Sequence, residues 1–152
     1  MHEALFYQTI DGKTVVCGLC HHHCRIQPDK RGRCGVRENR DGRLYSLVYG
    51  RLVAEHVDPV EKKPMFHLLP GSLSYSIATV GCNFQCQHCQ NYEISQYPAL
   101  HHGQIEGVGR SPATVVEQAV RTGCASISYT YVEPTIFYEF AYDCCVLARK
   151  RG

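Results

Sequence analysis

Cysteine placement constrains the fold of this chain more than any other feature of its sequence. Most of the cysteines form two tight groups, Cys17, Cys20, Cys24 and Cys34 in the first, and Cys82, Cys86 and Cys89 in the second. The N-terminus shows no basic region followed by an apolar stretch, so we expect no export signal and a reducing, cytoplasmic location. Clustered thiols in such a compartment indicate metal or redox chemistry rather than disulfides.

Charge and hydropathy exclude several classes of partner. The 16 basic and 14 acidic residues give a net charge of +2, which is too weak a field to predict nucleic-acid or anionic membrane binding. No apolar run approaches the roughly 18 residues that a membrane helix needs. Hydrophobic residues make up 44% of the chain, as in a globular protein.

Turn signals divide the chain into two units. Asp11-Gly12 and Asp41-Gly42 are typical hairpin turns, and Asp58-Pro59 is expected to end whatever precedes it. We therefore predict a small cysteine-rich β-hairpin module and connector over residues 1–68, and a second domain over 69–152. The strands expected in the first unit are 4–10, 14–17, 35–39 and 43–49.

The second unit has the pattern of a parallel α/β sheet. A buried strand over 73–80 is followed by a loop over 90–110. A helix then starts at Ser111-Pro112 and stops at Gly123. A strand over 125–131 and a helix from about 135 to 151 complete two βα repeats. The chain stops where a third strand would begin, so we expect a fragment with little activity alone.

The second cysteine group has the spacing C-x3-C-x2-C, directly after the expected buried strand. Three thiolates leave one position of a soft metal without a protein ligand, and an open position is typical of a catalytic site. A structural zinc site completed by His88 or His101 is an alternative. An electron-transfer ferredoxin is another, although its usual spacing differs.

This motif resembles that of the radical S-adenosylmethionine (radical SAM) superfamily. The resemblance implies that Cys82, Cys86 and Cys89 bind three irons of a [4Fe–4S] cluster, and that S-adenosylmethionine chelates the fourth. It also implies a partial (β/α)6 barrel, of which this chain holds the first two βα units. The residue before the third cysteine, His88, would lie near the adenine.

Further runs resemble the AmmeMemoRadiSam-system radical SAM enzyme, a family similar to pyruvate formate-lyase activating enzymes. These runs are residues 58–64, 69–72, 81–84 and 129–135. In activating enzymes a Gly-Gly-Glu-Pro stretch meets the amino group of the cofactor, and only Glu133-Pro134 matches it here. The resemblance thus makes Glu133, and less directly Thr130, candidates for that contact. An acid favoured by a helix dipole is the competing interpretation of Glu133.

The resemblance implies an enzyme that cleaves S-adenosylmethionine reductively to a 5′-deoxyadenosyl radical, which abstracts hydrogen from an unknown small-molecule or protein substrate. A low-potential electron donor such as flavodoxin or ferredoxin is the expected partner, and no side chain is assigned as catalytic. Two functions of other classes remain open. One is a zinc-stapled binding module without catalysis, and the other is an iron–sulfur electron carrier.

The first cysteine group supplies four thiolates, which fit either a closed zinc site or an auxiliary iron–sulfur cluster. Zinc is favoured slightly, because small hairpin-rich units often need a metal to fold. The run His21-His22-His23 inside this group is interpreted as an exposed polar loop.

Overall fold

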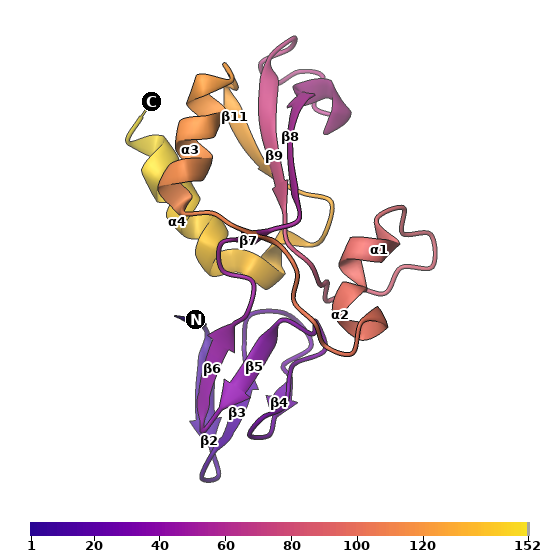
Figure 1. The fold of residues 1–152 in the computed structure, drawn as a ribbon, viewed down its shortest axis with the longest axis vertical. Coiled ribbons are helices and arrows are strands. Elements are labelled where there is room, and N and C mark those ends of the chain that lie inside the picture. Colours follow the sequence, from indigo (N-terminus) through magenta and orange to yellow (C-terminus); the bar gives the residue numbers. More distant parts are fainter. Residues whose placement is uncertain (152) are drawn as a thin grey trace.

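The computed structural model describes residues 1–151 and shows a mixed α/β protein. In Figure 1 the N-terminal strands form a lower lobe, and the later strands and long helices form an upper one. Two three-stranded antiparallel sheets build the lower lobe, in the orders β2-β3-β4 and β1-β6-β5. Their strands are β1 (His2–Glu3), β2 (Tyr7–Ile10), β3 (Thr14–Cys17), β4 (Arg25–Ile26), β5 (Arg37–Arg40) and β6 (Arg43–Ser46).

Both predicted hairpins are present in this lobe. Tyr7 pairs with Cys17 and Ile10 with Thr14 across the first turn, and Arg40 pairs with Arg43 across the second. The first strand is shorter than expected, because Phe6 has a positive φ of 56° and interrupts the extended backbone. The last expected strand also ends early, at Ser46.

The upper lobe contains the three-stranded sheet β11-β9-β8. Strands β9 (Leu73–Ala78) and β11 (Ser126–Tyr129) run parallel, which agrees with the predicted βα repeats. Strand β8 (Ala54–Pro59) pairs antiparallel with β9 and was missed. The expectation that Asp58-Pro59 ends what precedes it is confirmed, because β8 ends at Pro59, on an edge strand where a missing amide proton costs little.

The segment 90–110 was expected to be a loop, and it contains short elements. These are α1 (Tyr92–Ser95), α2 (Tyr97–Leu100) and β10 (Val108–Gly109), the last of which pairs with β7 (Arg51–Leu52). Each is too short to leave a periodic pattern in the sequence. A 3-10 turn, η1 (Val60–Lys62), follows β8 directly.

Two longer helices cover the parallel strands. Helix α3 (Pro112–Arg121) begins where predicted, since the Ser111 hydroxyl accepts a 3.0 Å hydrogen bond from the Thr114 amide. The second predicted helix is divided into a 3-10 turn, η2 (Pro134–Phe137), and α4 (Tyr138–Arg149). Buried residues of both helices pack with β9: Val115, Ala119, Phe140, Cys144 and Ile77. The spacing in this helix predicts an apolar stripe of Val115, Val116, Ala119 and Val120, and the first three are buried whereas Val120 is exposed.

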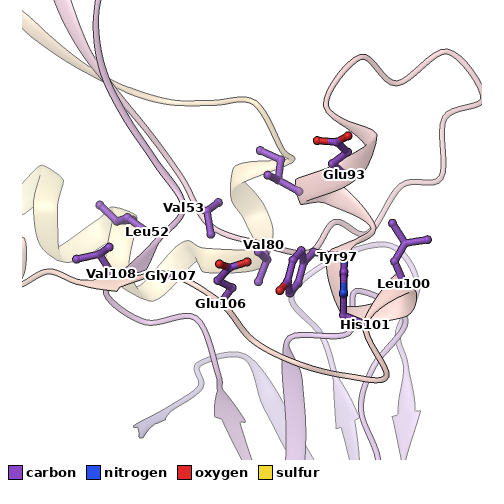
Figure 2. A pocket seen from close by; sticks show the side chains of 11 residues that line it. Leu52, Val53, Val80, Glu93, Tyr97, Leu100, His101, Glu106, Gly107 and Val108 are labelled. Carbon is purple, nitrogen blue, oxygen red and sulfur yellow. The ribbon is translucent and has the colours of Figure 1, made fainter.

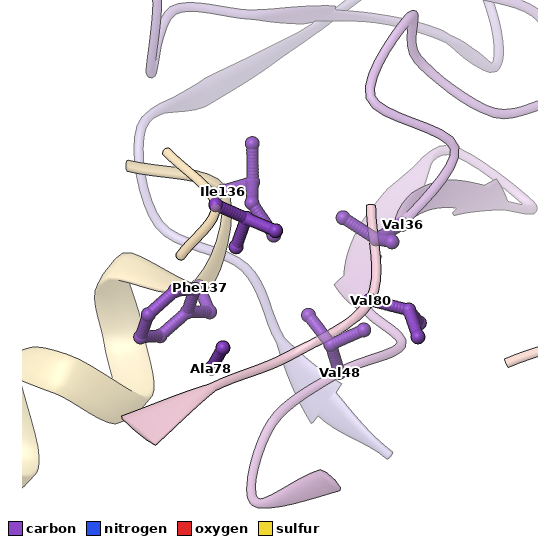
Figure 3. Close-up of a cluster of buried hydrophobic side chains, with 7 residues drawn as sticks. Val36, Val48, Ala78, Val80, Ile136 and Phe137 are labelled. Carbon is purple, nitrogen blue, oxygen red and sulfur yellow. The ribbon is translucent and has the colours of Figure 1, made fainter. Parts of the chain in front are cut away.

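One buried cluster joins the two lobes beneath the second cysteine group. Figure 3 shows valines of the hairpin module beside the end of β9 and the η2 turn. Its members are Val36, Val48, Ala78, Val80, Val132, Ile136 and Phe137. Because these residues come from distant parts of the chain, the loop that follows Val80 rests on both lobes.

The structure can be compared with the expected barrel, the expected domain division and the expected lack of a membrane helix. Within residues 1–151 the strands form open sheets, and no closed barrel is present. The division at residue 68 stays a prediction, and β8, which precedes it, pairs with β9, which follows it. No helix in the described part of the chain has both the length and the apolar character to cross a bilayer.

Candidate metal and cofactor site

A cavity of about 510 Å³ lies beside the ends of β9 and β11 and the loops that follow them. The carboxyl ends of neighbouring parallel strands meet at one sheet edge, where open α/β sheets usually bind ligands. The structure brings five predicted site residues together here: Cys82, Cys86, Cys89, Thr130 and Glu133 line this cavity. The volume lies in the range of small-molecule sites, which is about 300–1,000 Å³.

The backbone at Gly81 directs the cysteine loop into this cavity. Gly81 has a φ of +91°, and a Cβ atom there would lie 2.9 Å from the Cys34 carbonyl oxygen and would also collide with Val36. The preceding residue, Val80, is fully buried. Only glycine therefore allows the chain to turn from the core into the Cys82 loop at this close approach.

Hydrogen bonds reach two of the three sulfurs. The Phe84 amide donates to Cys82 Sγ at 3.4 Å, and Cys89 Sγ lies 3.6 Å from the Ser95 hydroxyl oxygen. Cys86 is exposed at the cavity rim. Hydrogen bonds of this kind hold the orientation of thiolate ligands and influence the potential of a bound centre. Among residues 1–151, no three histidine, cysteine or acidic side chains are already gathered as a metal site.

The contact of Glu133 with a cofactor stays a prediction, and the structure shows where this residue lies. It lines the cavity, and it also caps η2, because its Oε1 accepts a 3.4 Å hydrogen bond from the Thr135 amide as well as a 2.6 Å bond from the Thr135 hydroxyl. Thr130 stands in the loop directly after β11. His88 is exposed and does not line the cavity, so its predicted position near the adenine stays a prediction.

Sequence reasoning missed a cationic wall of the same cavity. Lys62 and Lys63 line it, and both donate to Asp58, with Nζ–O distances of 2.8 and 2.7 Å. Asp58 Oδ2 also accepts from the hydroxyls of Tyr131, at 2.6 Å, and Ser76, at 2.7 Å. The sequence signal for this wall is the lysine pair four and five residues after Asp58, which lies in the expected connector.

The pKa of Asp58 reflects this network. Burial by itself raises the pKa of the carboxyl, but the hydrogen bonds from Lys62, Lys63, Tyr131 and Ser76 outweigh it and hold the pKa far below its usual range. The carboxylate therefore stays ionised and fixes both ammonium groups at the cavity wall. Tyr131, which donates to Asp58, has a positive φ of 65°, a strained conformation for a bulky residue and one that is often found at functional sites.

The four cysteines of the first group also share a cavity. It is small, about 20 Å³, and the side chains of Cys17, Cys20, Cys24 and Cys34 line it. Burial raises the pKa of the Cys34 thiol to about 11 and raises that of Cys17 as well. His22 lies at the same cavity, and its Nε2 donates a 2.8 Å hydrogen bond to the Asn83 carbonyl oxygen in the second cysteine loop. The two groups are therefore linked.

A larger cavity, of about 610 Å³, contains only one of the candidate residues, His101, which the alternative zinc site would have used as a ligand. Figure 2 shows mainly apolar side chains around it, with Glu93 and Glu106 as its acids and with Tyr97 and His101 side by side. The rings of these last two stack with centroids 4.0 Å apart. Because it contains no cysteine, we place the candidate chemistry in the smaller cavity at the Cys82 loop.

Comparison with known proteins agrees with this placement. Residues 76–152 match the model of the Radical SAM superfamily, a range that starts in β9 and includes the whole Cys82 loop. The chain belongs to the radical SAM superfamily. No solved structure matches it significantly.

Two curated relatives from Methanocaldococcus jannaschii are similar to this radical SAM chain. Uncharacterized protein MJ0808 is 47% identical over 152 residues, which is 100% of this chain and 45% of the relative. Uncharacterized protein MJ0674 is 35% identical over 81 residues, or 53% of this chain and 19% of the relative. The chain thus spans less than half the length of either relative.

Radical SAM proteins typically bind a [4Fe–4S] cluster and S-adenosylmethionine, and the residues at this cavity fit both groups. Three cysteine sulfurs are the donor type that iron–sulfur clusters require, and the cavity volume suits a small cofactor. The wall also carries the carboxylate of Glu133 and the ammonium group of Lys62. These charges complement the amino and carboxylate groups of the methionine part of the cofactor.

Proposed function

We propose that this protein is a radical SAM enzyme of the AmmeMemoRadiSam-system type, similar to pyruvate formate-lyase activating enzymes. In this proposal the β9–α3–β11–α4 unit forms the first part of a partial (β/α)6 barrel. One observation carries the proposal: Cys82, Cys86 and Cys89 share a single cavity with Thr130 and Glu133. These residues are far apart in sequence, and the parallel pairing of β9 with β11 brings them together.

Each side chain has a defined role in this proposal. Cys82, Cys86 and Cys89 hold the cluster, Glu133 accepts hydrogen bonds from the cofactor's amino group, and Lys62 binds its carboxylate. When bound, the cluster and S-adenosylmethionine supply one-electron cleavage of a carbon–sulfur bond, which yields methionine and a 5′-deoxyadenosyl radical that abstracts hydrogen from the substrate.

The redox balance requires a partner. One electron per cleavage comes from a reduced low-potential carrier such as flavodoxin or ferredoxin. The substrate is a small molecule or a protein that offers an abstractable hydrogen. The protein's own part is to bind and orient the cofactor and to exclude water and other hydrogen donors from the cavity.

A zinc-stapled binding module is the second candidate function, and the link between the two cysteine groups favours it. Because His22 donates to Asn83, both groups could act as one structural unit. An open cavity of about 510 Å³ beside the second group argues against this, since structural zinc sites are closed.

Anaerobic reconstitution tests the proposal. The protein is loaded with iron and sulfide, reduced, and mixed with S-adenosylmethionine, and 5′-deoxyadenosine and methionine are quantified. We expect a change in the electron paramagnetic resonance spectrum of the cluster on cofactor addition, and both products in small amounts, because little activity is expected of this chain alone. Zinc at both cysteine groups without cluster formation would overturn the proposal in favour of the binding module. A cluster that does not respond to the cofactor would support an electron carrier.

A further inference from the structure

The small cavity of the first cysteine group lies at the junction between the lobes. Besides the cysteines, it is lined by Arg37 of β5, Asn83 of the second cysteine loop, and Thr135 and Ile136 of η2. A ligand bound there would therefore contact both the hairpin module and the radical SAM unit.

Arg37 is the residue at this cavity whose surroundings most need explanation. It is 2% exposed, yet only one of its guanidinium nitrogens is paired. Nη2 donates to Glu139 Oε1 at 2.8 Å and to the Leu5 carbonyl oxygen at 2.6 Å. Nε and Nη1 are buried with no hydrogen-bond partner among the described residues. Glu139 Oε2 of the same ion pair is likewise buried without a partner among the described residues. A buried donor of a charged group is unfavourable when it is unpaired, so the two free nitrogens of Arg37 call for an acceptor.

Two kinds of acceptor belong to residues that line the cavity: the sulfurs of the four cysteines, which accept strongly once ionised, and Asn83 Oδ1, which is also buried with no partner among the described residues. Metal-bound cysteine is a thiolate, and a metal with four thiolates carries a net negative charge that a buried guanidinium compensates. Arg37 and the four cysteines line the same cavity. His22 is a poor candidate for a further metal ligand, since its Nε2 already donates a hydrogen bond to the Asn83 carbonyl oxygen.

With the thiols in their present positions, the size of the cavity favours a single metal ion. About 20 Å³ is close to the space of one water-sized sphere, roughly 10–15 Å³, so the cavity suits a single ion. A multinuclear cluster needs far more space, as the cavity of about 510 Å³ at the second group provides. Four thiolates around one ion are typical of structural zinc. The thiols of residues 1–151 are not yet gathered as a metal site, so binding requires rotation of their side chains.

We propose that Cys17, Cys20, Cys24 and Cys34 bind one zinc ion, and that Arg37 donates hydrogen bonds from Nε and Nη1 to the zinc-bound sulfurs. Arg37 is a positioning residue for this site. Its third nitrogen holds Glu139 of α4, which is 102 residues away in sequence. The zinc site, Arg37 and Glu139 then form one chain of contacts that fixes the hairpin module on α4. The proposal does not depend on radical chemistry at the Cys82 cavity.

Zinc stoichiometry assigns the site. The full chain is loaded with zinc and the bound metal is counted after removal of free ions. We expect Cys20→Ala to lose one zinc and Cys86→Ala to retain it. An iron–sulfur cluster at the first group, or zinc retained by Cys20→Ala, would overturn the assignment.

Chelator competition on three variants isolates the part played by Arg37. Arg37→Met removes the free donors, and we expect zinc affinity to fall at least about tenfold, as for other residues that hydrogen-bond a metal ligand. Glu139→Gln weakens the same ion pair but keeps the free donors, so affinity should stay within about threefold. Arg37→Met/Glu139→Met replaces the buried pair by apolar side chains, which proteins often tolerate. It should fold yet bind zinc as weakly as Arg37→Met. Wild-type affinity in either folded Arg37 variant would refute the role.

A measurement on the unaltered protein removes any dependence on folding of the variants. Spin-active cadmium replaces zinc, and the Nε–H proton of Arg37 is observed by nuclear magnetic resonance. A hydrogen bond to a cadmium-bound sulfur produces scalar coupling between this proton and the metal. Coupling is the expected result. Its absence in a fully loaded, folded sample would contradict the hydrogen bond.

Discussion

The Tyr131 hydroxyl donates a 2.6 Å hydrogen bond to Asp58 Oδ2, which joins the loop after β11 to the C-terminal end of strand β8. The ammonium group of Lys63 lies 4.9 Å from the centre of the Tyr131 ring and donates to the same carboxylate. One buried carboxylate thus holds the cationic wall of the cavity and the strained Tyr131 backbone in place. The first prediction follows from the charge of this group.

Acid should weaken the folded protein through Asp58. The folded-state pKa of this carboxyl lies below its ordinary value of 3.8, so the unfolded chain binds the proton more readily. The stabilisation is therefore complete from about one pH unit above the ordinary pKa upward, and it is lost progressively as the pH falls below about 5. Asp58→Asn should remove this part of the pH dependence and lower the free energy of unfolding at neutral pH by about 3 kcal/mol.

Urea unfolding at several pH values measures both effects. Asp41→Asn is the matched control, because the Asp41 side chain is 76% exposed and pairs only with an exposed lysine. It should change the unfolding free energy by less than about 0.5 kcal/mol. Equal acid sensitivity in Asp58→Asn and the wild type would show that another carboxyl is responsible.

Gly81→Ala should destabilise the protein and displace the second cysteine loop. The new methyl group would collide with Val36 and would lie 2.9 Å from the Cys34 carbonyl oxygen, in a backbone of positive φ. Gly71→Ala is the control, since Gly71 also has a positive φ, +79°, but nothing within 4 Å of the added atom. We expect a loss of about 1 kcal/mol for Gly71→Ala and about 3 kcal/mol or more for Gly81→Ala. Similar losses of stability in the two variants would mean that the close approach of Gly81 to Val36 and Cys34 contributes little to the stability of the fold.

Cys86→Ala should abolish cluster assembly at the second group. Three sulfurs hold the proposed cluster, and the exposed Cys86 is the one without a hydrogen bond from the described residues. Iron and sulfide should fall to background, while the exposed Cys145→Ala control retains the wild-type content. Undiminished iron and a normal response to S-adenosylmethionine in Cys86→Ala would rule out this ligand.

Glu133→Gln should weaken binding of S-adenosylmethionine by about tenfold or more and leave cluster content unchanged, because it removes a charged hydrogen-bond acceptor for the amino group. The glutamine keeps an oxygen for Thr135, so the η2 cap and the melting temperature should be preserved. Glu117→Gln on the exposed side of α3 is the control. Equilibrium binding to the reconstituted protein gives both dissociation constants. Equal affinity in the two variants would leave Glu133 with only its capping role.

Elements whose signals are local could be predicted from the amino-acid sequence. Asp11-Gly12 and Asp41-Gly42 predict hairpins because their backbones favour the tight turns that hairpins need. Ser111-Pro112 predicts the start of α3 because capping depends on neighbouring residues only. The cysteine spacing likewise indicated the superfamily, since a short loop carries the whole motif.

The way in which these elements pack together could be seen only in the tertiary structure. The pairing of β8 with β9, the place of Lys62 at the cavity and the burial of Arg37 against Glu139 all join segments that are distant in sequence. Burial and charge then decide what such residues can do, because a guanidinium that water solvates needs no partner, whereas one that is 2% exposed does. No local pattern encodes that difference, since it arises only when the two lobes pack together.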